Sequence, residues 1–351
     1  MASASDPILV TGAAGFLGAP LVRHLLDAGR TVRAVDIDPI PDDLIADGAE
    51  PFHIDIRDGR AVREVCRGVD AVIHAASIQP VSRASRRSFW QVNVGGTWNI
   101  LNGAREGGAR RVVYTSSSAP YGIPVQTPLD EDSPFAPICD YGRSKVAAED
   151  LCRIFRARGL DTVVLRPRVL VGPRRLGFYH YVFNWIADHR RIFIFGDGRN
   201  RFQMLGLNDA VAACARALET SSEHRDFNIG AASFGTVRED IEALVRHAGS
   251  GSRVTSVHAG AARKALTALD RIGASPFTAW HYLTADEPFY FDIGRANAEL
   301  PWHPKQSNID ALADAYDWYA ANRKSVDGDL GTTHHKALRQ RAFRLLKMVS
   351  M

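Results

Sequence analysis

Long hydrophobic runs and paired cysteines are both missing from this sequence. No stretch approaches the roughly 18 consecutive apolar residues that a transmembrane helix needs. The four cysteines (Cys66, Cys139, Cys152 and Cys214) have no CxxC or metal-ligand spacing. Scattered thiols of this kind are typical of reduced cysteines in the cytosol. We therefore expect a cytoplasmic protein with no membrane span, no disulfide and no metal site.

The chain has little net positive charge outside its last 27 residues. The net charge is +4 over 351 residues. Residues 325–351 contain five Lys or Arg and two Asp, a net +3, so the rest of the chain carries only +1. A nearly neutral body offers no clustered basic face, and we expect no nucleic-acid partner.

The basic tail, residues 325–351, begins with a polar linker that contains glycine. Its pattern then predicts an amphipathic helix over residues 336–349, with Leu338, Ala342 and Leu345 on one stripe. Such a helix fits a peripheral contact with an anionic membrane surface. Docking on the body of the chain, pairing with a second subunit and an unfolded tail are the alternatives.

The first half of the chain alternates short apolar runs with amphipathic stretches of helical length. This alternation predicts an α/β fold with a doubly wound parallel sheet. The expected strands are Ile8–Val10, Thr31–Val35, Ala71–His74, Val112–Thr115 and Thr162–Leu165. The expected helices are Leu17–Ala28, Gly59–Cys66, Phe89–Glu106 and Ser144–Arg158.

A glycine-rich turn, TGAAGFLG over residues 11–18, follows the first expected strand and opens the first helix. In this context the glycines allow a tight turn and close approach to a pyrophosphate, and the helix N-terminus favours negative charge. Asp36 ends the second strand, where a carboxylate can bind the adenosine ribose. No arginine directly follows Asp36, so NAD is favoured over NADP. Asp55, after the third run, is a candidate for the adenine amino group.

These signals predict a Rossmann-type NAD-binding domain over residues 5–170, to which residues 205–230 return. Residues 171–204 and 231–324 are less regular and rich in aromatic residues. We expect them to form a smaller C-terminal lobe that binds a small-molecule substrate. Core packing is an equally good explanation for each aromatic residue taken singly.

Tyr141 and Lys145 are four residues apart at the start of an expected helix, so both would point to one face. A free phenol has a pKa of about 10 and needs nearby positive charge to act as a base at neutral pH. Lys145 and the nicotinamide cation would supply that charge. The serines of the run 116–118 follow a strand and would lie at the carboxyl edge of the sheet, where ligands bind in such folds.

Together these motifs resemble the extended short-chain dehydrogenase/reductases, specifically the NAD-dependent epimerase/dehydratase family, over residues 8–322. Further supports are His74–Ala76, Asn93–Thr97, Leu165–Pro167 with Gly172–Pro173, Phe227–Gly230 and Leu300–Trp302. The resemblance implies Ser117, Tyr141 and Lys145 as catalytic residues, with Ser118 as the alternative to Ser117, and a homodimer. The NAD site that it implies comprises Gly12, Gly15, Phe16, Leu17, Asp36, Ile37, Asp55, Ile56, Ala75, Ala76, Asn93, Tyr141, Lys145 and Pro167.

Two departures from the family pattern bear on the reaction. Dehydratases of the family usually carry Asp-Glu after the catalytic Ser/Thr, where this chain has Ser118-Ala119, so dehydration is not expected. Nucleotide-sugar members place an arginine for the substrate pyrophosphate seven residues before an acid. In this chain the position seven residues before Asp209 is occupied by Phe202, and Arg201 is adjacent to it. Val169 also replaces an asparagine that often contacts the substrate.

The leading hypothesis is an NAD-dependent nucleotide-sugar epimerase that works by transient hydride transfer to NAD. The rival is an NAD-dependent alcohol dehydrogenase or ketoreductase of the 3β-hydroxysteroid-dehydrogenase-like type, acting on a hydroxylated apolar compound. Phe202, Val169 and the aromatic lobe favour the rival. A catalytically silent NAD-binding protein is a third class, but the intact Tyr141/Lys145 pair disfavours it.

Overall fold

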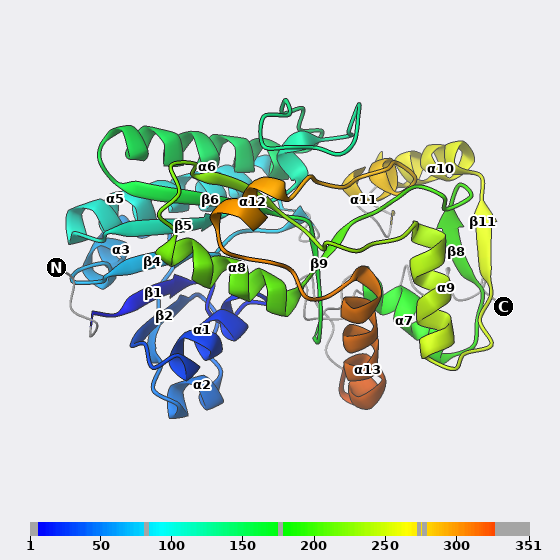
Figure 1. Ribbon diagram of the computed structural model, residues 1–351, viewed down its shortest axis with the longest axis horizontal. Helices are drawn as coiled ribbons and strands as arrows, with labels where there is room; N and C mark the ends of the chain where they lie inside the picture. The colour runs from blue at the N-terminus through cyan, green and yellow to red at the C-terminus, as the bar shows by residue number, and fades with distance from the viewer. Residues whose placement is uncertain (1–5, 81–83, 175–177, 272–274, 276–278, 327–351) are drawn as a thin grey trace.

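The computed structural model describes residues 6–80, 84–174, 178–271, 275 and 279–326 (Figure 1). The helix expected over residues 336–349 lies outside these residues. Within them, no helix is long and apolar enough to cross a bilayer, and no group of His, Cys, Asp and Glu side chains could hold a metal ion.

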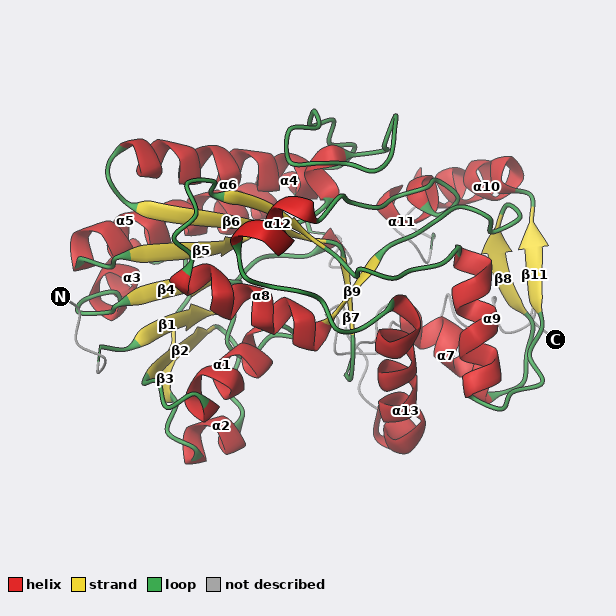
Figure 2. Cartoon of the chain, viewed as in Figure 1, coloured by secondary structure: helices red, strands yellow, loops and turns green. Residues whose placement is uncertain are grey.

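A seven-stranded sheet in the order β10-β6-β5-β4-β1-β2-β3 forms the larger part of the molecule, and all its pairings are parallel (Figures 1 and 2). The strand order reverses between β1 and β4, which is the switch point of a Rossmann-type sheet. The expected doubly wound α/β fold is thereby confirmed. The strands are β1 (Ile8–Thr11), β2 (Val32–Asp36), β3 (Glu50–His53), β4 (Ala71–His74), β5 (Arg111–Thr115), β6 (Asp161–Pro167) and β10 (Asp226–Ile229).

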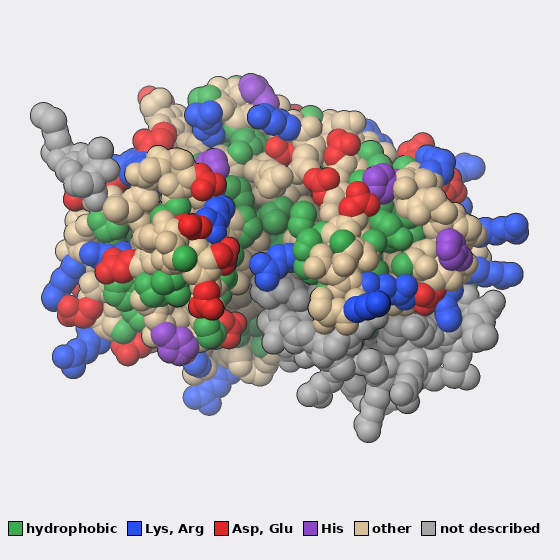
Figure 3. Space-filling model, turned by 90° about the horizontal axis from the view of Figure 1, so that it is seen from below, with side chains coloured by type: hydrophobic (Ala, Val, Ile, Leu, Met, Phe, Trp, Pro, Cys, Tyr) green, Lys and Arg blue, Asp and Glu red, His purple; other side chains and the backbone are tan. Residues whose placement is uncertain are grey.

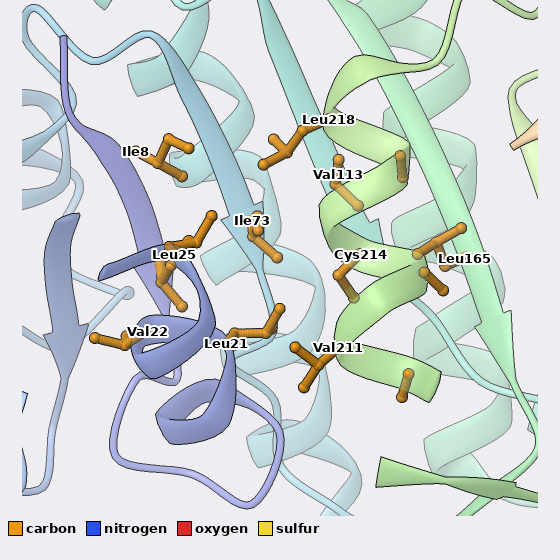
Figure 4. Packing of buried hydrophobic residues seen from close by; sticks show 14 of the residues in the cluster. Ile8, Leu21, Val22, Leu25, Ile73, Val113, Leu165, Val211, Cys214 and Leu218 are labelled. Atoms are coloured by element: carbon orange, nitrogen blue, oxygen red, sulfur yellow. The ribbon is translucent and has the colours of Figure 1, made fainter. Parts of the chain in front are cut away.

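Two hydrophobic layers cover the faces of this sheet. One contains α1, α8 and the residues around Trp302, and Figure 4 shows Leu21 of α1 and Val211 of α8 packed toward Ile73 of β4. The other contains α3, α5 and α6. The helices of this part are α1 (Gly18–Asp27), α2 (Asp42–Ala46), α3 (Gly59–Val65), α4 (Arg86–Phe89), α5 (Thr97–Gly107), α6 (Asp140–Ala157), α8 (Leu207–Glu219) and α12 (Gly294–Glu299).

Beyond the carboxyl ends of β6 and β5, the chain builds a smaller group of elements around its own aromatic core (Figure 1). Two short parallel pairs, β7 with β9 and β8 with β11, belong to it. Seen from below, acidic and basic side chains are interspersed over the described part of the surface (Figure 3). The elements are β7 (Val169–Val171), α7 (Tyr179–Ala187), β8 (Ile192–Phe195), β9 (Met204–Gly206), α9 (Val237–His247), β11 (Val254–Val257), α10 (Ala259–Arg271), α11 (Ala279–Thr284) and α13 (Asn308–Val326).

The helix expected over Phe89–Glu106 is interrupted. α4 is followed by a π-helix, η2 (Trp90–Gly96), before α5 begins. Short π-helical insertions are often found at functional sites. Gly96 lets Ile56 pack directly on this turn, because a Cβ there would collide with the Ile56 side chain.

Candidate active site

The glycine turn after β1 packs on the loop after β4, at the switch point of the sheet. Gly12 has a φ of +72°, and a Cβ there would lie 2.8 Å from the amide nitrogen of Ala76. The amide nitrogens of Ala75 and Ala76 donate to the carbonyl and hydroxyl oxygens of Thr11, at 3.2 and 3.3 Å. A Cβ on Gly18 would collide with the Gly12 carbonyl. This cradle, at the start of α1, fits the pyrophosphate of a dinucleotide.

Asp36 connects the end of β2 to the same turn. Its carboxylate accepts hydrogen bonds from the amides of Ala14 (2.9 Å) and Asp38 (3.0 Å). The next residue, Ile37, is 59% exposed, so both lie at the open edge of the cradle. Phe16 and Leu17 belong to the turn that leads into α1.

Asp55 lies farther along this edge, beyond β3. Its carboxylate binds the Arg57 side chain and the Arg57 amide, and the Arg57 guanidinium lowers the pKa of Asp55 below its usual value. Together with Gln91 and Gly95, Asp55 lines an open surface hollow. The neighbouring Ile56 is buried.

Asn93 lies in the π-helix and is buried. Its Oδ1 accepts from the amide of Ile78 at 2.8 Å, and its Nδ2 donates to the hydroxyl of Ser144 at 3.0 Å. Asn93 therefore ties the loop after β4 to the helix that carries Tyr141 and Lys145. In the described structure the Asn93 side chain forms its hydrogen bonds with Ile78 and Ser144.

Tyr141 and Lys145 lie in the first turns of α6 and are both buried, at 5% and 2% exposure. Cys139 caps this helix by accepting from the amide of Gly142. The Lys145 Nζ donates to the carbonyl of Thr115 at 2.9 Å and lies 5.9 Å from the centroid of the Tyr141 ring. The structure thus brings the two residues together against the end of β5.

Burial dominates the electrostatics of this pair. It lowers the pKa of Lys145 to about 7, although the nearby Glu149 carboxylate favours the charged form. Burial and the Lys145 charge lower the pKa of His74 to about 3. A neutral His74 then bridges the hydroxyls of Thr11 (2.6 Å) and Thr97 (3.0 Å), and so connects the glycine turn to α5.

The hydroxyl turn, residues 116–118, follows β5. Ser116 donates to Glu149 at 2.5 Å, and Ser118 accepts from Arg168 at 2.9 Å; both serines are buried. Ser117 between them is partly exposed, and its hydroxyl accepts from the amide of Ala119 at 3.1 Å. Ala119 packs in one cluster with Tyr141. Ser117 is therefore the most accessible of the three serine hydroxyls in this turn.

A buried polar network beneath the site was not predicted from the sequence. Glu149 accepts from Arg166 at 2.8 Å, and Arg166 also donates to the Tyr121 hydroxyl at 3.0 Å. Tyr121 in turn donates to Asn228 of β10 at 2.8 Å. A usable signal was the position of Glu149, four residues after Lys145 on the same helix. Its partner Arg166 is distant in sequence, so the pairing needed the structure.

On the lobe side, Phe202 and Arg201 point in different directions. The partly buried Phe202 ring faces inward, 4.8 Å from the guanidinium carbon of the buried Arg168. The exposed Arg201 stacks on Phe234 and Tyr290, at 4.5 and 4.9 Å. The register of this segment therefore turns the aromatic side chain inward and the cation outward.

Pro167 lies at the end of β6, where its carbonyl accepts from the amide of Ser118 at 3.1 Å. The residue after it, Arg168, is also buried. Its burial was not predicted, although a charged side chain that follows an apolar strand was a usable signal.

Comparison with known proteins gives a consistent result. Residues 8–230 match the model of the NAD dependent epimerase/dehydratase family. The chain is 29% identical to a UDP-glucose 4-epimerase of Streptomyces lividans over 350 residues, 92% of this chain and 99% of that protein. It is 34% identical to sterol demethylase protein B of Methylococcus capsulatus over 252 residues, 68% of this chain and 74% of that protein.

Solved structures agree in fold. A crystal structure of a dTDP-glucose 4,6-dehydratase from Streptomyces venezuelae with NAD bound superposes with a TM-score of 0.74. The two chains are 26% identical, and the superposition covers 92% of this chain and 99% of the dehydratase.

Replacement of Gly12 by alanine should weaken NAD binding by about tenfold or more, because the new Cβ meets the Ala76 backbone and the positive φ costs further energy. Titration calorimetry with NAD measures this. Gly29→Ala is the matched control, since Gly29 has the same φ of +72° but nothing within 4 Å. Equal NAD affinity in the two variants would contradict the cradle.

The lowered pKa of Lys145 predicts a pH-dependent stability. Between about pH 7 and 10.5, the unfolded chain holds a proton that the folded Lys145 has released, so the free energy of unfolding rises with pH. Relative to Lys145→Met, NAD-free wild-type protein should gain up to about 1.4 kcal/mol per pH unit in this window. Urea unfolding at several pH values measures this. Lys324→Met, at an exposed position, controls for the loss of a lysine. A pH-independent difference for Lys145→Met would refute the shift.

Proposed function

Since the chain belongs to the NAD-dependent epimerase/dehydratase family, we propose that it is an NAD-dependent epimerase of a nucleotide sugar. The observation that carries the proposal is the buried Tyr141/Lys145 pair, with the Lys145 ammonium held at the end of β5 directly before the hydroxyl turn that contains Ser117. These groups suit the oxidation of a secondary alcohol followed by reduction of the ketone from the opposite face.

In the proposed reaction each of the three side chains has its own task. Tyr141 takes the proton from the substrate hydroxyl and later returns it. Lys145, when protonated, stabilises negative charge on the Tyr141 oxygen. Ser117 donates a hydrogen bond to the reacting oxygen of the substrate. Proton transfer by a positioned side chain contributes about 10² to 10⁴ to a rate.

NAD supplies the acceptor and donor for the hydride in this reaction. The residues proposed to hold it surround the switch point of the sheet. Gly12 and Ala76 form the pyrophosphate cradle, Asp36 takes the ribose, and Asp55 lies toward the adenine. Gly15, Phe16, Leu17, Ile37, Ile56, Ala75, Asn93 and Pro167 complete the proposed site, with Tyr141 and Lys145 at the nicotinamide end.

The choice of a nucleotide sugar is supported by the match to the UDP-glucose 4-epimerase of Streptomyces lividans along almost the whole of both chains. The second candidate is an NAD-dependent dehydrogenase of a hydroxylated apolar compound. The inward Phe202 and outward Arg201 favour it, because they leave an aromatic ring where an arginine would bind a pyrophosphate. The similarity to sterol demethylase protein B also supports it.

Replacement of Tyr141 by phenylalanine should lower the turnover number by a factor of about 100 or more. The substrate is first identified by incubating the protein and NAD with a panel of nucleotide sugars and hydroxylated lipids. Chromatography with mass spectrometry then identifies the product. Tyr316→Phe, in the hydrophobic cluster of α13, is the control and should retain activity.

The product distinguishes the two candidates. Unchanged mass without net NADH means epimerisation, whereas loss of two hydrogens with matching NADH means dehydrogenation. Full turnover in Tyr141→Phe would contradict the proposed general base.

Binding of UDP to the NAD-loaded protein tests the substrate class separately. The epimerase candidate predicts that UDP binds and competes with the substrate. Absence of UDP binding in calorimetry would exclude a UDP-sugar as the substrate.

A further inference from the structure

Arg168 is a charged side chain buried where nothing in the proposed chemistry uses it. It follows Pro167 at the end of β6 and is only 2% exposed. No carboxylate in the described part of the chain forms an ion pair with it, and burial lowers its pKa to about 9. Burying a guanidinium without a counter-ion is costly. The cost suggests that its placement serves a purpose.

The guanidinium joins the hydroxyl turn to the lobe. Its Nη1 donates to the Ser118 hydroxyl at 2.9 Å, and its Nε donates to the carbonyl of Gln203 at 3.2 Å. Its carbon lies 3.8 Å from the ring centroid of Phe289 and 4.8 Å from that of Phe202. Cation–π contacts of this kind are strongest when desolvated.

The third nitrogen of the guanidinium, Nη2, is buried and has no hydrogen-bond partner among the described residues. The two bonded nitrogens connect Arg168 to the proposed chemistry through the residues that they hold. Ser118 is the residue of interest, because it adjoins Ser117 in the hydroxyl turn.

Two buried contacts flank Ser117. On one side Ser116 is held by Glu149, and on the other Ser118 is held by Arg168. Within the described part of the chain, the Ser117 hydroxyl has only the local bond from the Ala119 amide, and Ser117 is the partly exposed member of the turn. The position of its hydroxyl therefore depends on how firmly its two neighbours are fixed.

We propose that Arg168 is a positioning residue, which fixes Ser118 and thereby the hydroxyl of Ser117 in line with Tyr141. The inference rests on the proposed function, in which Ser117 binds the reacting oxygen. Since Arg168 also holds the backbone at Gln203 and packs on Phe289, it sets the hydroxyl turn relative to the lobe.

Kinetics of Arg168→Met, Arg168→Lys and Ser118→Ala, with the substrate found in the product analysis, test the proposal. Arg168→Met should lower kcat about tenfold, because small displacements of catalytic groups cost up to about 100-fold. KM and NAD affinity should change by less than about threefold, since in the proposal Arg168 acts through Ser118 and not through a contact with either ligand. Arg168→Lys should recover most of kcat, because its ammonium can still donate to Ser118.

The double variant Arg168→Met/Ser118→Ala tests whether the effect passes through Ser118. Its kcat should match that of Ser118→Ala alone, because the same bond is lost in each. The losses in the free energy of unfolding caused by the two substitutions should likewise not add up in the double variant, as measured by chemical unfolding without substrate. Arg111→Met is the matched control, because Arg111 of β5 is also a buried arginine and is paired with Asp161 of β6. It should lower stability and leave the kcat of the folded protein unchanged.

The proposal would be overturned if Arg168→Met had the kcat of the wild type. It would also be overturned if the reductions in kcat of Arg168→Met and Ser118→Ala multiplied in the double variant. Coupling in unfolding without any change in kcat would also overturn it, since Arg168 would then be purely structural. Failure of the proposed function looks different. In that case wild-type protein turns over none of the substrates, or Tyr141→Phe is fully active.

Discussion

The ammonium group of Lys145 is buried between α6 and the end of β5, and the surrounding polar groups are arranged around that charge. Among the described residues it donates one hydrogen bond, to the carbonyl of Thr115, and Glu149 lies one turn further along the same helix. Glu149 is itself held by Arg166, because a carboxylate in the interior also needs a partner. His74 is kept neutral by the same burial and the same charge, and it ties the glycine turn to α5. The cofactor cradle and the proposed catalytic pair are thus parts of one connected polar interior.

Much of the fold could be predicted from local pattern. The run Ala71–His74 was predicted with its exact bounds, and the glycine turn was placed correctly between β1 and α1. Parallel strands separated by helices leave few alternatives for sheet topology. The π-helix around Asn93 was missed, because its apolar spacing reads as an ordinary helix. Gly96 in this turn packs against Ile56, which is distant in sequence, and such a contact has no local signal.

The candidate site was predictable where a residue is part of a short motif. Tyr141 and Lys145 are four residues apart on one helix, so their proximity follows from helix geometry. The sequence left Ser117 and Ser118 as alternatives, and burial separates them, since Ser118 is turned inward onto Arg168. The roles of Glu149 and Arg168 could not be predicted, because each depends on a partner from another strand or loop. Long-range pairing of buried charges has no local signature.

Substrate choice and chemistry are physically linked in this arrangement. The inward ring of Phe202 lies on one side of the Arg168 guanidinium, and the bond to Ser118 lies on another. A change in the lobe that shifts Phe202 or Phe289 would therefore move Arg168, and with it the hydroxyl turn. Such a link constrains which changes in the lobe are compatible with turnover.

The aromatic ring at Phe202 and the buried cation at Arg168 are best understood as a pair. An arginine at position 202 would place a second cation beside the first, where like charges repel. The arginine at position 168 therefore disfavours an inward diphosphate-binding arginine at position 202.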